Sequence, residues 1–434
     1  MKDIFKYLDT EATERDLRNG VADEYGVLYS EDGAYLLECR NRELKHYVVK
    51  DGCKIICDKA FFNHTPFSCE LESIVIPEGL IAIGNASFLA CGKLRNIVLP
   101  DSLRHIGESA FELCKSLEKI TLPSGLVSTG GNPFADSGIR RVISKSPHFK
   151  VVDDCLMNVD TMVAWISDIK RCVIPVGTKE IGNEVFNSNC NIHELLLPDG
   201  LEKIGSNAFQ GCTLQRLVIP RNVKIIGDNP FAFASVKTLE VASPHIMYKN
   251  GFLISDKGVL VAYMGTAVDV VIPDTICEVG AGAFYNRKDI QRIIMPSCLK
   301  VIRHHAFANC ENIAELVVPE SVNKIEQGAF EGCRSLRTTK LPQGLTFIDD
   351  SLFSHSGIEE LSIPDGVTHI GKQAFFFCNH LQIISIPASV REIDSYAFYA
   401  CEKLREISVP NGNVALGHNV FDICHTLKKN HIIK

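Results

Sequence analysis

The sequence lacks the features of a membrane-spanning protein and of a strongly charged nucleic-acid-binding protein. No run of apolar residues approaches the roughly 18 that a membrane-spanning helix requires. The net charge is −7, which argues against nucleic acid or an anionic membrane as the main partner. We therefore expect no nucleic-acid partner and no membrane insertion.

Motifs that carry known chemistry are also missing. The chain contains no G-x-S-x-G, no H-E-x-x-H, no phosphate-binding P-loop and no dinucleotide fingerprint. It has no C-x-x-C pair of the kind found in zinc sites. We expect no catalytic residue, no metal ligand and no cofactor, and so a protein that is not an enzyme. The alternative is an enzyme whose site is assembled from several repeats.

The N-terminus lacks a recognisable secretory leader. The segment "MKDIFKYLDTEATERDLRNG" has acids at Asp3 and Asp9 and no basic segment followed by an apolar one. The C-terminal "HTLKKNHIIK" has no lipid-anchor or retention signal. The expected location is cytoplasmic if Met1 is the native start, and the cell surface or the medium if a leader was removed.

What the chain does have is a repeat. Three copies are "IVLPDSLRHIGESAFELCKSL", "LVVPESVNKIEQGAFEGCRSL" and "ISIPASVREIDSYAFYACEKL", which begin at Ile97, Leu316 and Ile384. One phenylalanine marks each copy: Phe61, Phe88, Phe111, Phe134, Phe186, Phe209, Phe231, Phe284, Phe307, Phe330, Phe353, Phe375, Phe398 and Phe421. Most copies are 22 or 23 residues apart, and three spacings are longer, at 27, 52 and 53 residues. So regular a period predicts a solenoid of stacked coils.

Each coil can be interpreted from its residue types. In "KITLP", Ile120 and Leu122 alternate inward as in a short strand, and proline then ends the strand. The I-G pair turns the chain, and the A-F pair begins a tight corner that we expect to be helical or 3₁₀. Successive strands pair in parallel about 4.8 Å apart, and each phenylalanine stacks on the next. The predicted fold class is an α/β solenoid.

The two longest gaps hold related insertions. Segments such as "GVLYSEDGAYLLE" and "GFLISDKGVLVAY" predict β-hairpins with polar turns, and three such inserts are expected. The predicted organisation is one continuous solenoid with an N-terminal capping helix over residues 1–23, its helical pattern covering residues 2–19. Three modules follow, over residues 24–145, 146–242 and 243–434.

The frame I-P-x-x-(L/V)-x-x-I-G-x-x-A-F-x-x-C-x-x-L, together with the hairpin segments, resembles the BspA-like leucine-rich repeat family. The resemblance covers residues 24 to 427 in fourteen copies. It implies a right-handed leucine-rich repeat with a parallel β-sheet on one face. It also implies protein binding, because many family members are surface or secreted adhesion proteins of microbes. It carries no catalytic motif to this chain.

Ten of the 17 cysteines occupy one column, three or four residues after the phenylalanine or close to that place: Cys69, Cys91, Cys114, Cys190, Cys212, Cys310, Cys333, Cys378, Cys401 and Cys424. A nucleophile needs one special environment with a base beside it, and a repeated column offers the opposite. We interpret these thiols as small buried groups. Disulfides between adjacent coils and a reactive thiol stay open as alternatives.

Two columns of strand residues point outward and are the candidate protein-binding face. One lies two residues before each proline and is aliphatic in the N-terminal and middle coils, at Val75, Val98, Leu196, Val218, Val271, Ile294 and Val317. The other lies four residues before the proline and mixes charges, with Arg216 and Arg292 among them. The aliphatic column has two interpretations, β-propensity alone or a binding patch. The leading hypothesis is a non-catalytic protein-interaction scaffold, and the alternative is an exported adhesin that binds host or matrix protein.

Overall fold

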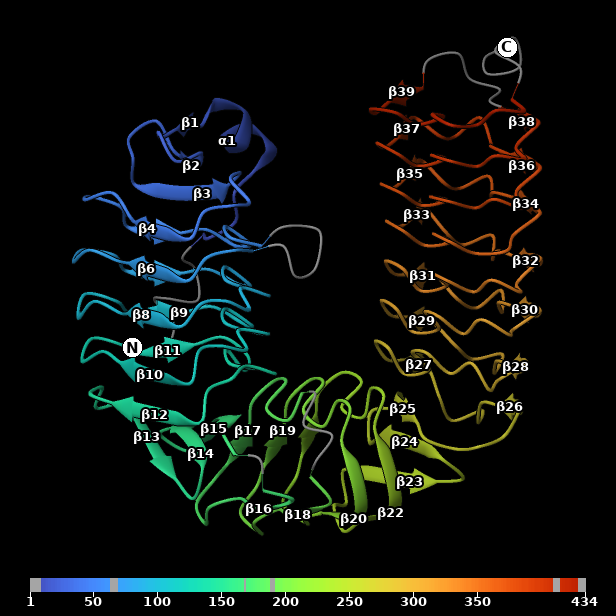
Figure 1. Ribbon diagram of the computed structural model, residues 1–434. Coiled ribbons are helices and arrows are strands. Elements are labelled where there is room, and N and C mark those ends of the chain that lie inside the picture. Colours follow the sequence, from blue (N-terminus) through green and yellow to red (C-terminus); the bar gives the residue numbers. More distant parts are fainter. Residues whose placement is uncertain (1–8, 63–68, 168, 188–191, 409–413, 428–434) are drawn as a thin grey trace. The chain divides into compact units, whose positions relative to one another are not determined.

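The computed structural model describes residues 9–62, 69–167, 169–187, 192–408 and 414–427. The chain divides into two compact units, Met1–Ser243 and Pro244–Lys434. Over the described residues it forms a β-solenoid of about 16 turns with parallel sheets and almost no helix (Figure 1).

The strands that precede the prolines form what we call the long-strand ladder. In most of them the central residue is buried and the two flanking residues are exposed, and within each sheet neighbouring strands pair in parallel without a shift of register. In Figure 1, β26, β28, β30 and β32 lie one above another. In the first unit this ladder contains β4 (His46–Val48), β6 (Ser73–Val75), β8 (Asn96–Val98), β10 (Lys119–Leu122), β12 (Arg141–Ser144), β16 (Arg171–Val173), β18 (Glu194–Leu196), β20 (Thr213–Ile219) and β22 (Ser235–Val241). In the second unit it contains β26 (Asp269–Val271), β28 (Arg292–Ile294), β30 (Glu315–Val317), β32 (Thr338–Lys340), β34 (Glu360–Ser362), β36 (Ile383–Ser385) and β38 (Glu406–Ser408).

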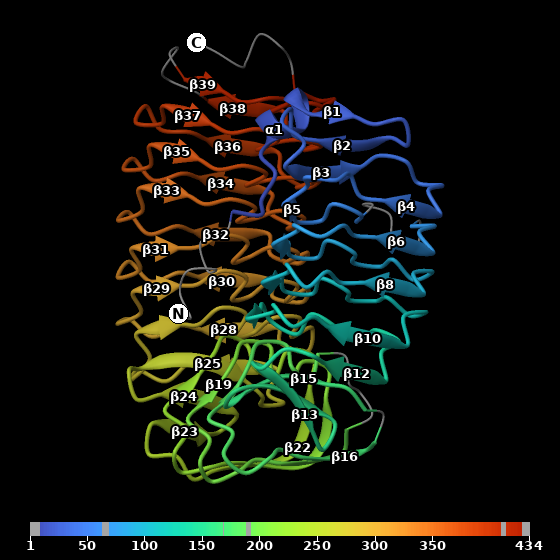
Figure 2. The same cartoon turned by 90° about the vertical axis from the view of Figure 1, so that its left-hand side faces the viewer.

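A second parallel ladder, which was not predicted, runs through the Ile of each I-G pair and the residue before it. We call it the short-strand ladder, because each of its strands in the coils has two residues. Figure 2 shows β33, β35, β37 and β39 stacked in this way. In the first unit its strands are β5 (Ile55–Ile56), β7 (Ala82–Ile83), β9 (His105–Ile106), β11 (Ser128–Thr129), β17 (Glu180–Ile181), β19 (Lys203–Ile204) and β21 (Ile225–Ile226). In the second unit they are β27 (Glu278–Val279), β29 (Val301–Ile302), β31 (Lys324–Ile325), β33 (Phe347–Ile348), β35 (His369–Ile370), β37 (Glu392–Ile393) and β39 (Ala415–Leu416).

The glycine after this strand is required for room rather than for a left-handed backbone. A Cβ on Gly107 would lie 2.4 Å from the carbonyl carbon of Gly84 in the preceding coil, and its φ is not positive. The backbones of neighbouring coils therefore approach closely at the end of this short strand.

Antiparallel strands occur at three places and lead into the short-strand ladder. β3, β15 and β25 each pair antiparallel with the strand before them and parallel with β5, β17 and β27 respectively. Each antiparallel segment therefore adds its strands to the beginning of a short-strand sheet. The strands are β1 (Val21–Ala22), β2 (Val27–Tyr29), β3 (Tyr35–Cys39), β13 (Phe149–Val152), β14 (Cys155–Asn158), β15 (Thr161–Trp165), β23 (Ile246–Lys249), β24 (Phe252–Ser255) and β25 (Val259–Tyr263). Right-handed winding stays a prediction.

The corners around the A-F pair are turns, so the predicted helical or 3₁₀ corners and the α/β class are wrong. In the coil of Phe88, Ala86 has φ +52° and Ala90 has φ +61°. The equivalent residues in the coil of Phe111, Ser109 and Leu113, are left-handed as well. A right-handed helix cannot continue through such residues, so two left-handed positions confine each corner to a turn.

The one helix among the described residues is short. α1 (Glu14–Asn19) begins at Thr13, whose hydroxyl accepts from the Asp16 backbone N–H while the Asp16 carboxylate accepts from the Thr13 N–H. This is a capping box. Residues 9–13 are not helical, and residues 1–8 of the predicted helix lie outside the described part. Leu17 packs against the small cluster that contains Leu28.

The core is a stack of phenylalanine rings, as predicted. Phe284 and Phe307 have centroids 5.0 Å apart, and Phe375 and Phe398 are also 5.0 Å apart with nearly parallel planes. Where a long gap interrupts the repeat, another ring begins the next stack. Trp165 lies 6.5 Å from Phe186, and Tyr263 lies 5.3 Å from Phe284.

Phe330→Ala is expected to lower the free energy of unfolding by about 3–5 kcal/mol, because it opens a cavity between two stacked rings. Phe330 is fully buried between Phe307 and Phe353, at 5.7 and 5.5 Å. Urea denaturation followed by circular dichroism measures the loss. The control is Phe347→Ala, because the Phe347 side chain is 44% exposed and should cost much less. Equal losses for the two variants would contradict the stacked-core account.

Candidate binding surface

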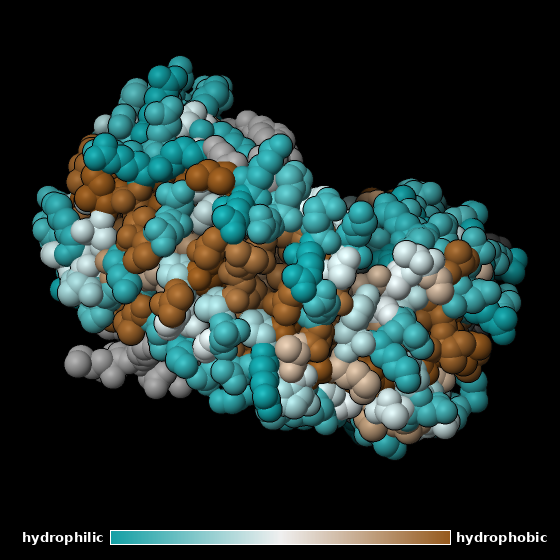
Figure 3. Space-filling view, turned by 90° about the horizontal axis from the view of Figure 1, so that it is seen from below, coloured by the Kyte–Doolittle hydropathy of each residue, from teal (hydrophilic) through white to brown (hydrophobic). Residues whose placement is uncertain are grey.

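Six of the seven aliphatic candidates are exposed on the long-strand ladder. Their exposed fractions run from 41% for Leu196 to 74% for Val98. Parallel pairing without register shift places Val75 beside Val98 and Val271 beside Ile294. Rows of aliphatic side chains therefore run across the strands. On the face seen in Figure 3, apolar side chains form patches that polar ones separate.

Val218, the seventh candidate, is half-buried. It lies opposite Glu240 on β22, and the Glu240 carboxylate pairs with Arg216 on the strand of Val218 itself. Val218 is therefore flanked by an ion pair that connects its own strand with the next. Two further members of the aliphatic row were not predicted, namely Val48 and Val173, which are 66% and 47% exposed. Val173 lies two residues before Pro175 and the same rule would have found it, whereas no proline follows Val48 at that spacing.

The two candidate arginines are in different situations. Arg216 is occupied, since its Nε and Nη2 each donate to a Glu240 carboxylate oxygen at 2.8 Å. Among the described residues, no ion pair within 4.0 Å involves Arg292. Arg292 lies in register between two acids of the neighbouring strands, Asp269 and Glu315. The second unit therefore presents a row of unpaired charges in the order negative, positive, negative.

A groove of about 970 Å³ lies on this part of the second unit. It crosses β26, β28 and β30 and is lined by Ile294 and Val317 together with Asp269, Arg292 and Glu315. We call it the β26–β30 groove. Three of the predicted residues, Arg292, Ile294 and Val317, are thus brought together.

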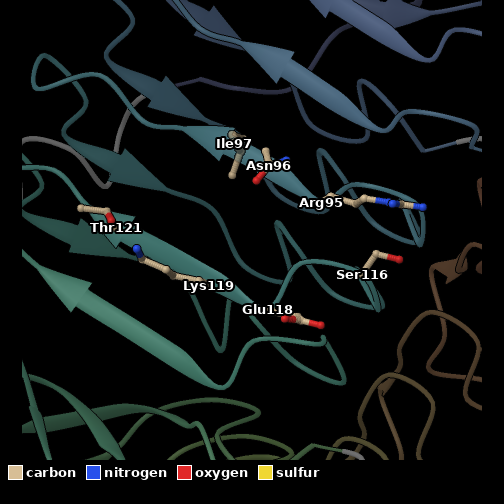
Figure 4. A pocket seen from close by; sticks show the side chains of 7 residues that line it. All are labelled: Arg95, Asn96, Ile97, Ser116, Glu118, Lys119 and Thr121. Carbon is tan, nitrogen blue, oxygen red and sulfur yellow. The ribbon is translucent and has the colours of Figure 1, made fainter.

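A smaller hollow of about 480 Å³ lies in the first unit between β8 and β10. These consecutive strands belong to separate sheets, and Ile97, at the centre of β8, is partly exposed where equivalent residues are buried. Figure 4 shows Arg95, Glu118 and Lys119 around the hollow, extending from its rim. Its charged side chains are exposed, and it lacks the aliphatic row of the β26–β30 groove.

The thiols of the cysteine column form hydrogen bonds between coils, which the sequence did not reveal. The Cys114 thiol donates to the Phe88 carbonyl of the preceding coil at 3.2 Å, and Cys310 and Cys378 repeat the bond to Phe284 and Phe353. Burial raises the pKa of the Cys310 and Cys378 thiols to about 12. A protonated thiol is a donor and not a nucleophile. Cys69 and Cys424 are less buried than predicted, and Cys190 lies outside the described residues.

In the described part of the chain, no group of three or more His, Cys, Asp or Glu residues is arranged to hold a metal ion. The same part contains no helix long and apolar enough to cross a membrane.

One carboxyl group has a perturbed environment. Burial raises the pKa of Glu184 to about 7, and the nearby charges of Glu108 and Glu112 add to the effect. The Ser109 hydroxyl donates to Glu184 Oε2 at 3.2 Å. Glu184 lies at a left-handed position of its corner, like Ala86 in the coil of Phe88.

Comparison with known proteins identifies the repeat. The model of the BspA type leucine rich repeat region matches residues 37–163, 164–253, 262–382 and 348–434. The chain belongs to the BspA-type leucine-rich repeat family. No curated protein matches it.

Several solved structures resemble this BspA-type chain. A leucine-rich repeat protein from Eubacterium ventriosum is 19% identical over 96% of this chain and 95% of that chain, with a TM-score of 0.54. A leucine rich cell surface protein from Faecalibacterium prausnitzii is 22% identical over 89% and 92%, with a TM-score of 0.44. The first likeness shows that this chain shares the fold of that leucine-rich repeat protein.

Thiol accessibility provides a test of the cysteine column. In the native protein, alkylation near neutral pH should label the exposed Cys277 and leave Cys114, Cys310 and Cys378 unmodified, as peptide mass spectrometry would show. Denaturation without reductant should then release most of the 17 cysteines as free thiols. A disulfide would be found first between Cys69 and Cys91, whose Sγ atoms lie 3.0 Å apart, and a protein with most cysteines oxidised would contradict the prediction.

Glu184→Gln should stabilise the protein at alkaline pH but not at acid pH. Because the pKa of Glu184 is about 7 in the folded protein, above the ordinary glutamate value of 4.5, ionisation of this carboxyl group opposes folding. The loss of folding free energy caused by this ionisation is absent below the pKa of the unfolded state. It grows as the pH rises from that pKa to the folded pKa, and it is complete above about pH 7. After allowance for solvent screening, the gain at pH 8 should be about 1–2 kcal/mol, measured by urea denaturation. The exposed Glu118→Gln is the control, and a pH-independent gain would contradict the assignment.

Proposed function

We propose that this chain is a non-catalytic protein-binding scaffold, and that partners contact the exposed face of its long-strand ladder. The observation that carries the proposal is the aliphatic row Val271, Ile294 and Val317. These side chains are 46% to 71% exposed in consecutive coils, and Ile294 and Val317 line the β26–β30 groove. Contiguous apolar surface of this kind is typical of interaction sites.

The alternative explanation of the row is β-propensity alone. In the same unit and the same column, however, β32, β34 and β36 carry Lys340, Ser362 and Ser385, all exposed. These strands pair in parallel just as β26 and β28 do. The strand position therefore does not require an aliphatic residue, which favours the binding interpretation for the coils that have one.

Site-specific photo-crosslinking tests this proposal. A benzophenone side chain at position 294 should capture discrete proteins from an extract of the source cells or their surroundings, and Val271→Asp together with Val317→Asp should abolish the capture. The control position is 176, because Val176 is 98% exposed in a turn outside the row. The same products from positions 176 and 294, or capture that persists in the double variant, would contradict a role for the row. Circular dichroism verifies that each variant is folded.

A further inference from the structure

The β26–β30 groove presents two parallel rows with different chemistry. One row is aliphatic and the other carries Asp269, Arg292 and Glu315. Because the strands pair without register shift, both rows run across the strands and each takes one residue from each coil. A partner that uses both rows must therefore repeat at the spacing of the coils.

The spacing of the coils favours one type of secondary structure in the partner. Neighbouring strands lie about 4.8 Å apart. An α-helix laid across the strands advances about 5.4 Å per turn, so one side chain per turn meets each coil with a drift of about 1.2 Å over three coils. In an extended chain, the side chains on one face lie about 6.6–6.8 Å apart. Their positions therefore depart from those of the coils by about 4 Å over three coils. Of these two structures, only the helix places one side chain against each residue of the two rows.

The length of the aliphatic row limits the length of that helix. The row begins in β26, the first strand of its sheet, and its aliphatic character ends where Lys340 occupies the column in β32. The Lys340 ammonium is engaged with Glu320 at 2.6 Å. Three coils correspond to about three helical turns, or about 11 residues.

The charged row determines the polarity of the partner. In the first unit two arginines of this column are neutralised within the chain, Arg171 by Glu194 at 3.1 Å and Arg216 by Glu240 at 2.8 Å. Arg141 has no such partner among the described residues, but its neighbour in register is Lys119, so that part of the column is basic and does not alternate in sign. Asp269, Arg292 and Glu315 form no ion pair within 4.0 Å among the described residues. A row that reads negative, positive, negative is complemented by side chains that read positive, negative, positive.

We propose that the β26–β30 groove binds an amphipathic α-helix of a partner protein, about three turns long. Its apolar stripe packs on Val271, Ile294 and Val317. Beside the stripe, basic, acidic and basic side chains one turn apart pair with Asp269, Arg292 and Glu315. This inference rests on the proposed function and specifies the partner class for the second unit.

The test uses the full chain and fluorescent peptides of about 14 residues, held helical by a lactam bridge on the face away from the groove. One peptide has an aliphatic stripe flanked by Lys, Glu and Lys, and the second has Glu, Lys and Glu. Fluorescence anisotropy at low salt should give a preference of about tenfold for the first peptide. Arg292→Glu should remove most of that preference. The triple variant Asp269→Lys, Arg292→Glu, Glu315→Lys should reverse it.

The controls separate this inference from the proposed function. Lys119→Glu, an exposed charge in the same column on β10, should leave the preference unchanged. Three results would overturn the helix inference. They are equal affinity for the two peptides, equal affinity for the first peptide and a version of it whose helix is broken by proline, and no binding of any peptide. If position 294 still captures a protein in that case, the surface binds a partner of another form. If it captures none, the proposed function fails as well.

Discussion

The close contact between one corner and the next is the constraint on which the rest of the structure depends. A stacked phenylalanine pair such as Phe88 and Phe111, 5.2 Å apart, sets the rise from coil to coil near the spacing that parallel strands need. The thiol of Cys114 then satisfies the carbonyl of Phe88, a buried polar group that would otherwise be costly. The rings, the thiols and both ladders are therefore compatible with the same spacing between coils, and a change of spacing in one coil would also affect its neighbours.

Because that distance is fixed internally, the outward residues of the strands are free of structural demands. Parallel pairing holds register from coil to coil, as between Val271 and Ile294, so a single outward position becomes a row on the surface. The row is aliphatic in β26, β28 and β30 and polar in β32 and β34. The same backbone can therefore present different surfaces along its length, and a repeat protein can change its binding surface without changing its core.

Much of the fold could be predicted from the sequence because inward residues repeat with the period of the coil. The phenylalanine stack, the strand before proline and the outward orientation of Val98 follow from alternation and spacing alone. The short strand of His105 and Ile106 was missed, since two residues are too few to display an alternating pattern. The corners were predicted to be helical or 3₁₀ because the A-F pair begins a tight corner, whereas the structure places residues such as Ala86 and Ala90 in left-handed conformations, which the residue types do not reveal.

The candidate site was predictable in its residues but not in its electrostatics. Sequence spacing gives the row that contains Ile294 and Val317, but it does not reveal whether a charge is neutralised by a neighbour. Arg216 and Arg292 have equivalent positions in the repeat, yet only Arg216 faces a glutamate that reaches its guanidinium with both oxygens. An arginine already engaged inside the chain has little to offer a partner, because binding would have to replace a bidentate ion pair. The proposed pairing of Arg292 with a charged partner therefore depends on this difference between the two positions and not on the composition of the face.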